Sequence, residues 1–262
     1  MSEVFRRVDV MHLVMVPGFW LDGDSWNDVA GPLRAAGHAV HQVTLPGMES
    51  RDADRSSIGL RDHIDAVIRV VDDCDGGVVL VGHSGGGAVA HAVADARPDR
   101  IARVVYVDSV PLGNGGVIND ELPVVDGEVP LPDWSVFDDE SLVDMTDEVR
   151  ARFKSIAIPE PVGVASDKQM LSDDRRYGIP STVVCCEMSS EVIRDLIAKG
   201  HPYVAELARF SDYELVDLPT GHWPQLTKPQ QLAQIILDAV DRAEISAWSV
   251  NTNHPFGQPG RT

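Results

Sequence analysis

The segment Gly82-His83-Ser84-Gly85-Gly86 places a serine among glycines at the junction of two regular elements. An apolar run, Val78–Val81, precedes it and an alanine-rich stretch, Ala88–Ala96, follows it, so a strand is expected to turn directly into a helix. A turn this sharp needs residues without bulk beside its apex, and glycine meets that need. The pattern therefore predicts a serine hydroxyl exposed at the apex and a free backbone N–H at the start of the helix.

Apolar runs alternate with helical patterns along most of the chain. Strands are expected at residues 12–16, 39–45, 78–81, 101–107, 179–186 and 213–218. Helices are expected at residues 25–37, from Ser56 or Ser57 to about 72, and at 85–97, 191–199 and 230–242. Strand–helix alternation of this kind predicts an α/β fold with a mostly parallel sheet and helices on both of its faces.

Two regions interrupt this alternation. Residues 112–177 are rich in proline and acidic residues, and they contain only two short helical patterns, near 138–143 and 146–157. An insertion of this length in a compact domain is typical of a helical lid. We therefore expect a core made of residues 1–111 and 178–245, a lid at 112–177, and a flexible polar tail at 246–262.

Composition limits the partners. The chain has 262 residues, enough for one substantial core, and 41 acidic against 22 basic residues give a formal net charge of −19. This field repels phosphate backbones and anionic lipid headgroups, which disfavours nucleic acids and membranes as partners. A small-molecule substrate is expected instead, and the oligomeric state stays open.

The cysteines and the chain start indicate a cytoplasmic protein. Cys74, Cys185 and Cys186 do not form a disulfide framework, and the adjacent pair lies in an expected buried strand. No ligand spacing typical of a metal site occurs, so neither a metal nor a cofactor is expected. The first ten residues have no apolar segment of signal-peptide length, and no apolar run approaches the ~20 residues that span a bilayer.

Three motifs in this order resemble the α/β-hydrolase superfamily. They are Pro17-Gly18-Phe19-Trp20 after the first strand, Gly82-His83-Ser84-Gly85-Gly86, and Gly221-His222-Trp223 after the last strand. The resemblance covers roughly residues 10–242 and is closest to the small single-lid esterase, methylesterase and hydroxynitrile-lyase branch. It implies a serine nucleophile, a histidine base, an orienting acid and an oxyanion hole, but none of the motifs specifies a substrate.

Ser84 is the expected nucleophile, and a histidine must accept its proton. His222 is the expected base, because it follows the last strand, where the family carries this residue. His83 belongs to the turn but points sideways from it, and His201 ends a helix, so both are interpreted as structural. The remaining histidines fall in segments expected to face away from the carboxyl edge of the sheet: residues 38, 41, 63, 91 and 254.

The oxyanion hole needs two N–H donors aimed at one point. Gly85 supplies the first, and the resemblance implies Phe19 as the second. Four further aromatic residues are candidates for the substrate pocket, with plain packing as the alternative for each: Trp20, Trp134, Phe153 and Trp223.

Two carboxylates compete for the role of the acid. The usual family position follows the strand at 179–186, where this chain has Glu187 and no aspartate. Asp108 follows the strand at 101–107, a second position with family precedent, and the carboxyl ends of parallel strands are where ligand-facing groups gather. Asp108 is the predicted acid, with Glu187 as the second choice.

Three functions compete at this stage. The first is a serine hydrolase that cleaves a small or medium ester, thioester or lactone through an acyl-enzyme. The second is a non-hydrolytic enzyme of the same fold, either hydroxynitrile-lyase-like or a cofactor-free isomerase or cyclase. Lyases of this branch tend to carry a lysine after the fifth strand, and none lies between Glu187 and Arg194. The third is a non-catalytic binding protein, which the Ser84/His222 pair disfavours.

Overall fold

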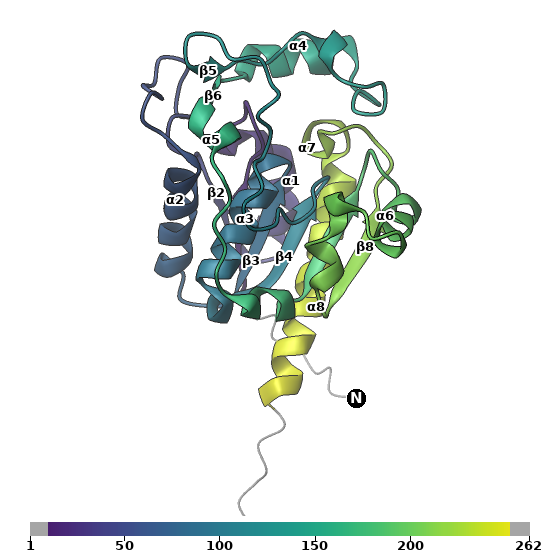
Figure 1. The fold of residues 1–262 in the computed structure, drawn as a ribbon. Helices are drawn as coiled ribbons and strands as arrows, with labels where there is room; N and C mark the ends of the chain where they lie inside the picture. Colours follow the sequence, from purple (N-terminus) through teal and green to yellow (C-terminus); the bar gives the residue numbers. More distant parts are fainter. Residues whose placement is uncertain (1–9, 252–262) are drawn as a thin grey trace, which may run out of the picture.

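Six parallel strands form the central sheet, in the order β2-β1-β3-β4-β7-β8 (Figure 1), in a computed structural model that describes residues 10–251. The strands are β1 His12–Val16, β2 Ala39–Gln42, β3 Val78–His83, β4 Ile101–Val107, β7 Ser181–Cys185 and β8 Tyr213–Asp217. Each neighbouring pair is parallel, which confirms the predicted α/β fold.

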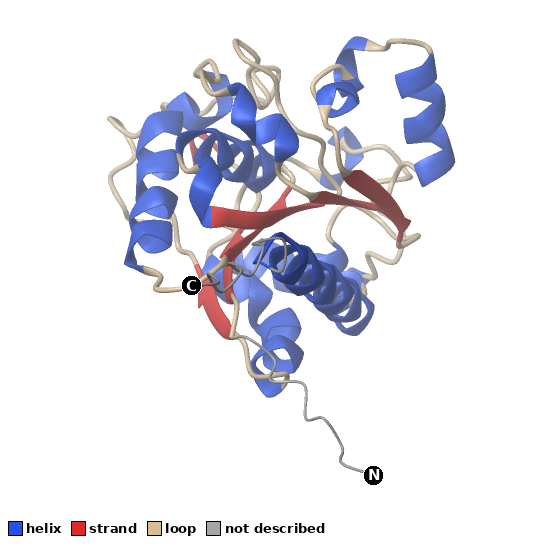
Figure 2. Ribbon diagram, turned by 90° about the horizontal axis from the view of Figure 1, so that it is seen from below, coloured by secondary structure: helices blue, strands red, loops and turns tan. Residues whose placement is uncertain are grey.

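Helices cover both faces of the sheet, as the view from below shows (Figure 2). The helices of the core are α1 Asn27–Ala35, α2 Leu60–Asp73, α3 Gly85–Ala96, α6 Ser190–Ala198, α7 Pro224–Thr227 and α8 Pro229–Asn251. Short 3₁₀ turns lie at Gly23–Trp26, Pro98–Arg100, Trp134–Val136, Asp174–Gly178, Pro202–Val204 and Leu207–Arg209. Alternate strand residues pack into two separate clusters, one with α1 and α8 and the other with α2, α3 and α6.

Several predicted boundaries are wrong. Strand β2 ends at Gln42 rather than at residue 45, and residues 138–143 form turns instead of a helix. Helix α2 begins after Gly59, because the Asp62 carboxylate accepts the Gly59 N–H at 2.9 Å. Ser56 does not cap the helix, since its own N–H donates to Asp54. Helix α8 continues to residue 251 and so includes the start of the predicted tail, whose remainder lies outside the described residues.

The insertion contains a two-stranded antiparallel ribbon and two helices, and these elements lie at the top of the molecule in Figure 1. Its elements are β5 Glu128–Val129, α4 Asp147–Ile156, β6 Glu160–Pro161 and α5 Val162–Ser166. Phe153 of α4 is fully buried, with ring centroids 5.7 Å from Trp134 and 5.1 Å from Trp223. Because Trp223 follows the last strand, this contact joins the insertion to the core.

Two further features concern the surroundings of the protein. Within residues 10–251 no helix combines the length and the apolar character needed to cross a membrane. The three cysteines are buried free thiols, and the adjacent pair lies at the end of β7 as predicted.

Replacing Phe153 with alanine should lower the free energy of unfolding by ~3–5 kcal/mol, because it empties a fully enclosed aromatic site. Met170 lies in the same insertion and is 75% exposed, so Met170→Ala is the matched control and should have little effect. Urea unfolding of the two variants measures both values. Equal stabilities would contradict the packing described for α4.

Candidate active site

Ser84 lies at the apex of the turn between β3 and α3. Its φ of 51° is in the left-handed region, which residues other than glycine rarely adopt. The Ser84 N–H donates to the carbonyl of Val107 at 3.1 Å, which ties the apex to strand β4. A Cβ at Gly82 would lie 2.5 Å from the carbonyl oxygen of Gly86, so the close approach of strand and helix requires glycine. The turn therefore holds the Ser84 hydroxyl at the carboxyl edge of the sheet.

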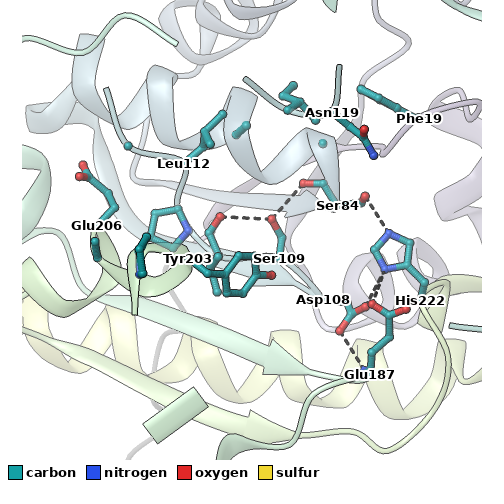
Figure 3. Close-up of a pocket in the computed structure, with 18 of the residues that line it drawn as sticks. Phe19, Ser84, Asp108, Ser109, Leu112, Asn119, Glu187, Tyr203, Glu206 and His222 are labelled. Carbon is teal, nitrogen blue, oxygen red and sulfur yellow. Dashed lines mark hydrogen bonds and ion pairs between the residues drawn. The ribbon is translucent and has the colours of Figure 1, made fainter. Parts of the chain in front are cut away.

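A hydrogen-bond chain runs from Ser84 to Asp108 (Figure 3). Oγ of Ser84 lies 2.8 Å from Nε2 of His222, and Nδ1 of His222 lies 2.7 Å from Oδ2 of Asp108. The other oxygen of Asp108 accepts the backbone N–H groups of Cys186 and Glu187, both at 3.1 Å. These bonds fix the carboxylate, so that one oxygen faces the imidazole.

Glu187 brings a second carboxylate to the same ring. Its Oε2 lies 3.2 Å from Nδ1 of His222, and its side chain also forms a hydrogen bond with Ser141. The structure thus brings both predicted acids to one nitrogen, as Figure 3 shows. The shorter distance belongs to Asp108, which is also the more deeply buried carboxylate, with a side chain 7% exposed against 23% for Glu187.

The two carboxylates change the protonation of His222. Burial disfavours a charged ring, but the hydrogen bonds to Asp108 and Glu187 outweigh it and raise the pKa of His222 to about 10. Burial raises the pKa of Asp108, whereas hydrogen bonds from His222 and Ser141 overcome burial and lower the pKa of Glu187 to about 2. The two carboxylates therefore stabilise the imidazolium form that the ring adopts when it accepts a proton.

His83 supports the loop that carries His222. Its Nδ1 lies 3.1 Å from the side-chain amide nitrogen of Gln225, which can only donate, so Nε2 carries the proton. That Nε2–H donates to the backbone carbonyl of His222 at 2.6 Å. Burial lowers the pKa of His83 to about 3, which keeps the ring neutral. His83 therefore has a structural position, as expected.

The other described histidines that were interpreted as structural do not line the cavity that contains Ser84. His91 contacts Tyr106 and Glu206, and His201 accepts the N–H of Tyr203. His63 lies in the first turn of α2 and is therefore nearer the carboxyl edge of the sheet than predicted. Its Nε2 forms a hydrogen bond with the carbonyl of Pro46. His38 and His41 do not line the cavity either. His254 lies outside the described residues.

Two residues that line the cavity have backbone N–H groups without acceptors. Those of Phe19 and Gly85 have no hydrogen-bond partner among residues 10–251, and both residues line the cavity that contains Ser84. Gly85 begins α3, so its N–H also lies at the positive end of the helix dipole. The arrangement can accept a developing negative charge.

The insertion holds the loop that carries Phe19. Trp20 has a φ of 67°, and its N–H donates to Oε2 of Glu160 at 3.2 Å. Its carbonyl accepts the N–H of Ile158 at 2.9 Å, and its indole N–H donates to Val129 at 3.0 Å. Burial raises the pKa of Glu160 to about 8. No sequence pattern pointed to Glu160, because its partner lies 140 residues away.

A cavity of about 790 Å³ opens above Ser84. Phe19, Trp20 and Trp223 line it, as predicted for the two tryptophans. Trp134 and Phe153 do not line it, so their prediction as pocket residues is wrong: both pack behind Trp223. The apolar lining also includes residues that the sequence analysis missed, namely Val110, Leu112, Ile118, Leu122 and Phe137. These residues lie in irregular segments, where hydrophobic periodicity gives no signal.

Asp108, Glu187 and His222 are one of two groups among the described residues whose donor atoms lie close enough to hold a metal ion. Their atoms already bond one another, and Nε2 of the ring faces Ser84. The geometry is that of a proton relay.

Comparisons with known proteins agree with this geometry. A model of the alpha/beta hydrolase family matches residues 13–235. A carbendazim hydrolyzing esterase from Nocardioides sp. (strain SG-4G) is 35% identical over 43% of this chain, but the match spans only 47% of that relative. Lipase LipV of Mycobacterium tuberculosis is 30% identical over 62% of this chain and 68% of its own length.

A solved structure has the same fold. It is an extracellular alpha/beta-hydrolase from a Paenibacillus species, 21% identical, with a TM-score of 0.70 over 87% of this chain and 98% of that chain.

Replacing Glu187 with glutamine should lower the pKa of His222 by about 1–3, because one of two opposite charges beside the imidazolium is lost. An NMR titration of the ring, assigned with a His222→Gln variant, measures the change. The NMR signals of His201, which lies outside the site, provide the internal control and should be the same in the variant and the wild type. An unchanged His222 pKa would show that Glu187 does not interact with the ring in solution.

Proposed function

The chain belongs to the alpha/beta hydrolase family, and we propose that it is a serine hydrolase that cleaves a carboxylic ester through an acyl-enzyme on Ser84. The observation that carries this proposal is the continuous hydrogen-bond chain from Ser84 through His222 to Asp108, beside two free N–H groups. The names of the relatives, an esterase and a lipase, support the same chemistry.

In the proposed mechanism, Oγ of Ser84 attacks the ester carbonyl while Nε2 of His222 takes its proton. The N–H groups of Phe19 and Gly85 then stabilise the tetrahedral oxyanion. His222 returns the proton to the leaving alkoxide. A water molecule, deprotonated by the same nitrogen, then attacks the acyl carbon, and the ring gives this proton to Oγ of Ser84 as the acid leaves. Asp108 holds the ring in the tautomer that these steps require, and it stabilises the imidazolium.

The shape of the cavity supports a substrate with a bulky apolar group beside the ester. Aromatic and aliphatic side chains surround Ser84, among them Phe19, Leu112, Phe137 and Trp223. A cavity of about 790 Å³ lies within the usual range for sites of small organic ligands. The insertion supplies Phe137 and braces Trp20, and we therefore assign it the role of a lid. We place the enzyme in the cytoplasm, because its three cysteines are buried free thiols.

The Ser84→Ala variant should lose p-nitrophenyl ester hydrolysis and fluorophosphonate labelling, yet keep its melting temperature, since it lacks one hydroxyl on an exposed turn. Ser109→Ala is the matched control, because Ser109 lines the same cavity but its Oγ donates to the backbone carbonyls of Ser84 and Val110. This control should still be labelled. Mass spectrometry locates the label, and labelling that persisted in Ser84→Ala would place the nucleophile elsewhere.

The two carboxylates should differ in their effect on rate. Asp108→Asn should lose about 10⁴ in kcat, since the amide cannot hold the required tautomer. Glu187→Gln should keep most of the maximal rate and shift the rise of activity with pH to lower pH. The reason is that a base must be neutral, and removing Glu187 takes away one of the two carboxylates that raise the pKa of His222. A larger loss of kcat in Glu187→Gln than in Asp108→Asn would reverse the assignment.

A further inference from the structure

Two histidines and a cysteine meet at the edge of the sheet opposite Ser84. His12 opens β1, His41 lies in β2, and Cys74 follows the last residue of α2. In the parallel register His12 pairs with Ala39 and Val14 pairs with His41, so both rings leave the same face of the sheet. Helix α2 packs on this face, and its end brings the thiol to the rings.

The donor atoms converge at metal-binding distances. Nδ1 of His12 lies 3.0 Å from Nε2 of His41, and Sγ of Cys74 lies 3.9 Å from that Nε2. The three donor atoms lie within 4.8 Å of one another. Around a tetrahedral zinc ion, the bond lengths put two nitrogens about 3.3 Å apart and a nitrogen and a sulfur about 3.6 Å apart. The two distances measured from Nε2 of His41 lie within a few tenths of an ångström of these values.

Asp75 orients one of the rings. Its Oδ1 lies 2.8 Å from Nε2 of His12, which fixes the proton on that nitrogen and leaves the lone pair of Nδ1 directed at the cluster. A carboxylate bound to the outer nitrogen of a histidine is the usual support of a metal ligand. The thiol of Cys74 is buried and donates to the carbonyl of Val70, so it is held close to the rings.

We propose that His12, His41 and Cys74 form a zinc site, with water as the fourth ligand. Imidazole nitrogen and thiolate sulfur favour Zn²⁺ over the oxygen-seeking ions Mg²⁺ and Ca²⁺. On binding, Cys74 releases its proton to solvent and its thiolate joins the ion. The ion links β1, the edge strand β2 and the end of α2, and it lies at the opposite edge of the sheet from the hydroxyl of Ser84. Its role is therefore to stabilise the fold, and this proposal does not depend on the proposed hydrolase activity.

Titration of the full-length protein, stripped of metal, with cobalt(II) chloride tests the site. One equivalent of Co²⁺ should produce visible bands of a tetrahedral ion and a near-ultraviolet thiolate-to-cobalt band, and Zn²⁺ should displace it. Excess Zn²⁺ should raise the melting temperature of the wild type, since an ion that binds only the folded state stabilises it.

Cys74→Ser should remove the thiolate band, and His41→Asn, on the partly exposed edge strand, should weaken Co²⁺ binding at least tenfold. His201→Asn changes a histidine outside the cluster and should keep the full signal. Absence of a stoichiometric Co²⁺ spectrum in the wild type, or an unchanged spectrum in the folded His41→Asn variant, would overturn the proposal.

Discussion

The left-handed backbone at Ser84 is the constraint on which the rest of the site depends. A strand can pass into a helix within one residue only if nothing bulky stands beside the apex, and the contact between Gly82 and Gly86 leaves no room for a side chain. Two neighbours of the serine, Trp20 and Asp108, also have positive φ. Strain of this kind persists only where surrounding contacts hold it, and here those contacts place a hydroxyl, an N–H pair and a carboxylate around one point.

Core strands hold Ser84 and Asp108, whereas the contacts that hold Trp20 come from the insertion. The β5–β6 ribbon accepts the backbone N–H and the indole N–H of Trp20, and Ile158, just before β6, donates to its carbonyl. These bonds fix the loop that carries the free N–H of Phe19. Between β5 and β6 in the sequence, the carbonyl of Ser141 accepts the N–H of His222 at 2.9 Å. The insertion therefore lines part of the cavity and holds the loops that carry Phe19 and His222. We therefore expect that changes to the insertion would affect rate as well as substrate choice.

The sequence predicted what is encoded locally. The turn at Ser84 and the loop of His222 each lie within a few residues, next to clear strand patterns. Spacing could not rank Asp108 against Glu187, because they follow adjacent strands, β4 and β7, and both reach the same ring. Residues that meet only through contacts between distant segments are not marked by any local sequence pattern. Glu160 beside the oxyanion loop and the cluster of His12, His41 and Cys74 arise only when the chain folds, so a search for short ligand spacings predicted no metal site.

A crystal structure of the protein after reaction with a p-nitrophenyl alkylphosphonate tests the central claim most directly, since the adduct mimics the tetrahedral intermediate. The account predicts phosphorus bonded to Oγ of Ser84, with one phosphoryl oxygen within hydrogen-bond distance of the N–H groups of both Phe19 and Gly85. The alkyl group should lie among the apolar residues of the cavity. A phosphonyl group on another residue, or an oxygen directed away from both N–H groups, would contradict the account.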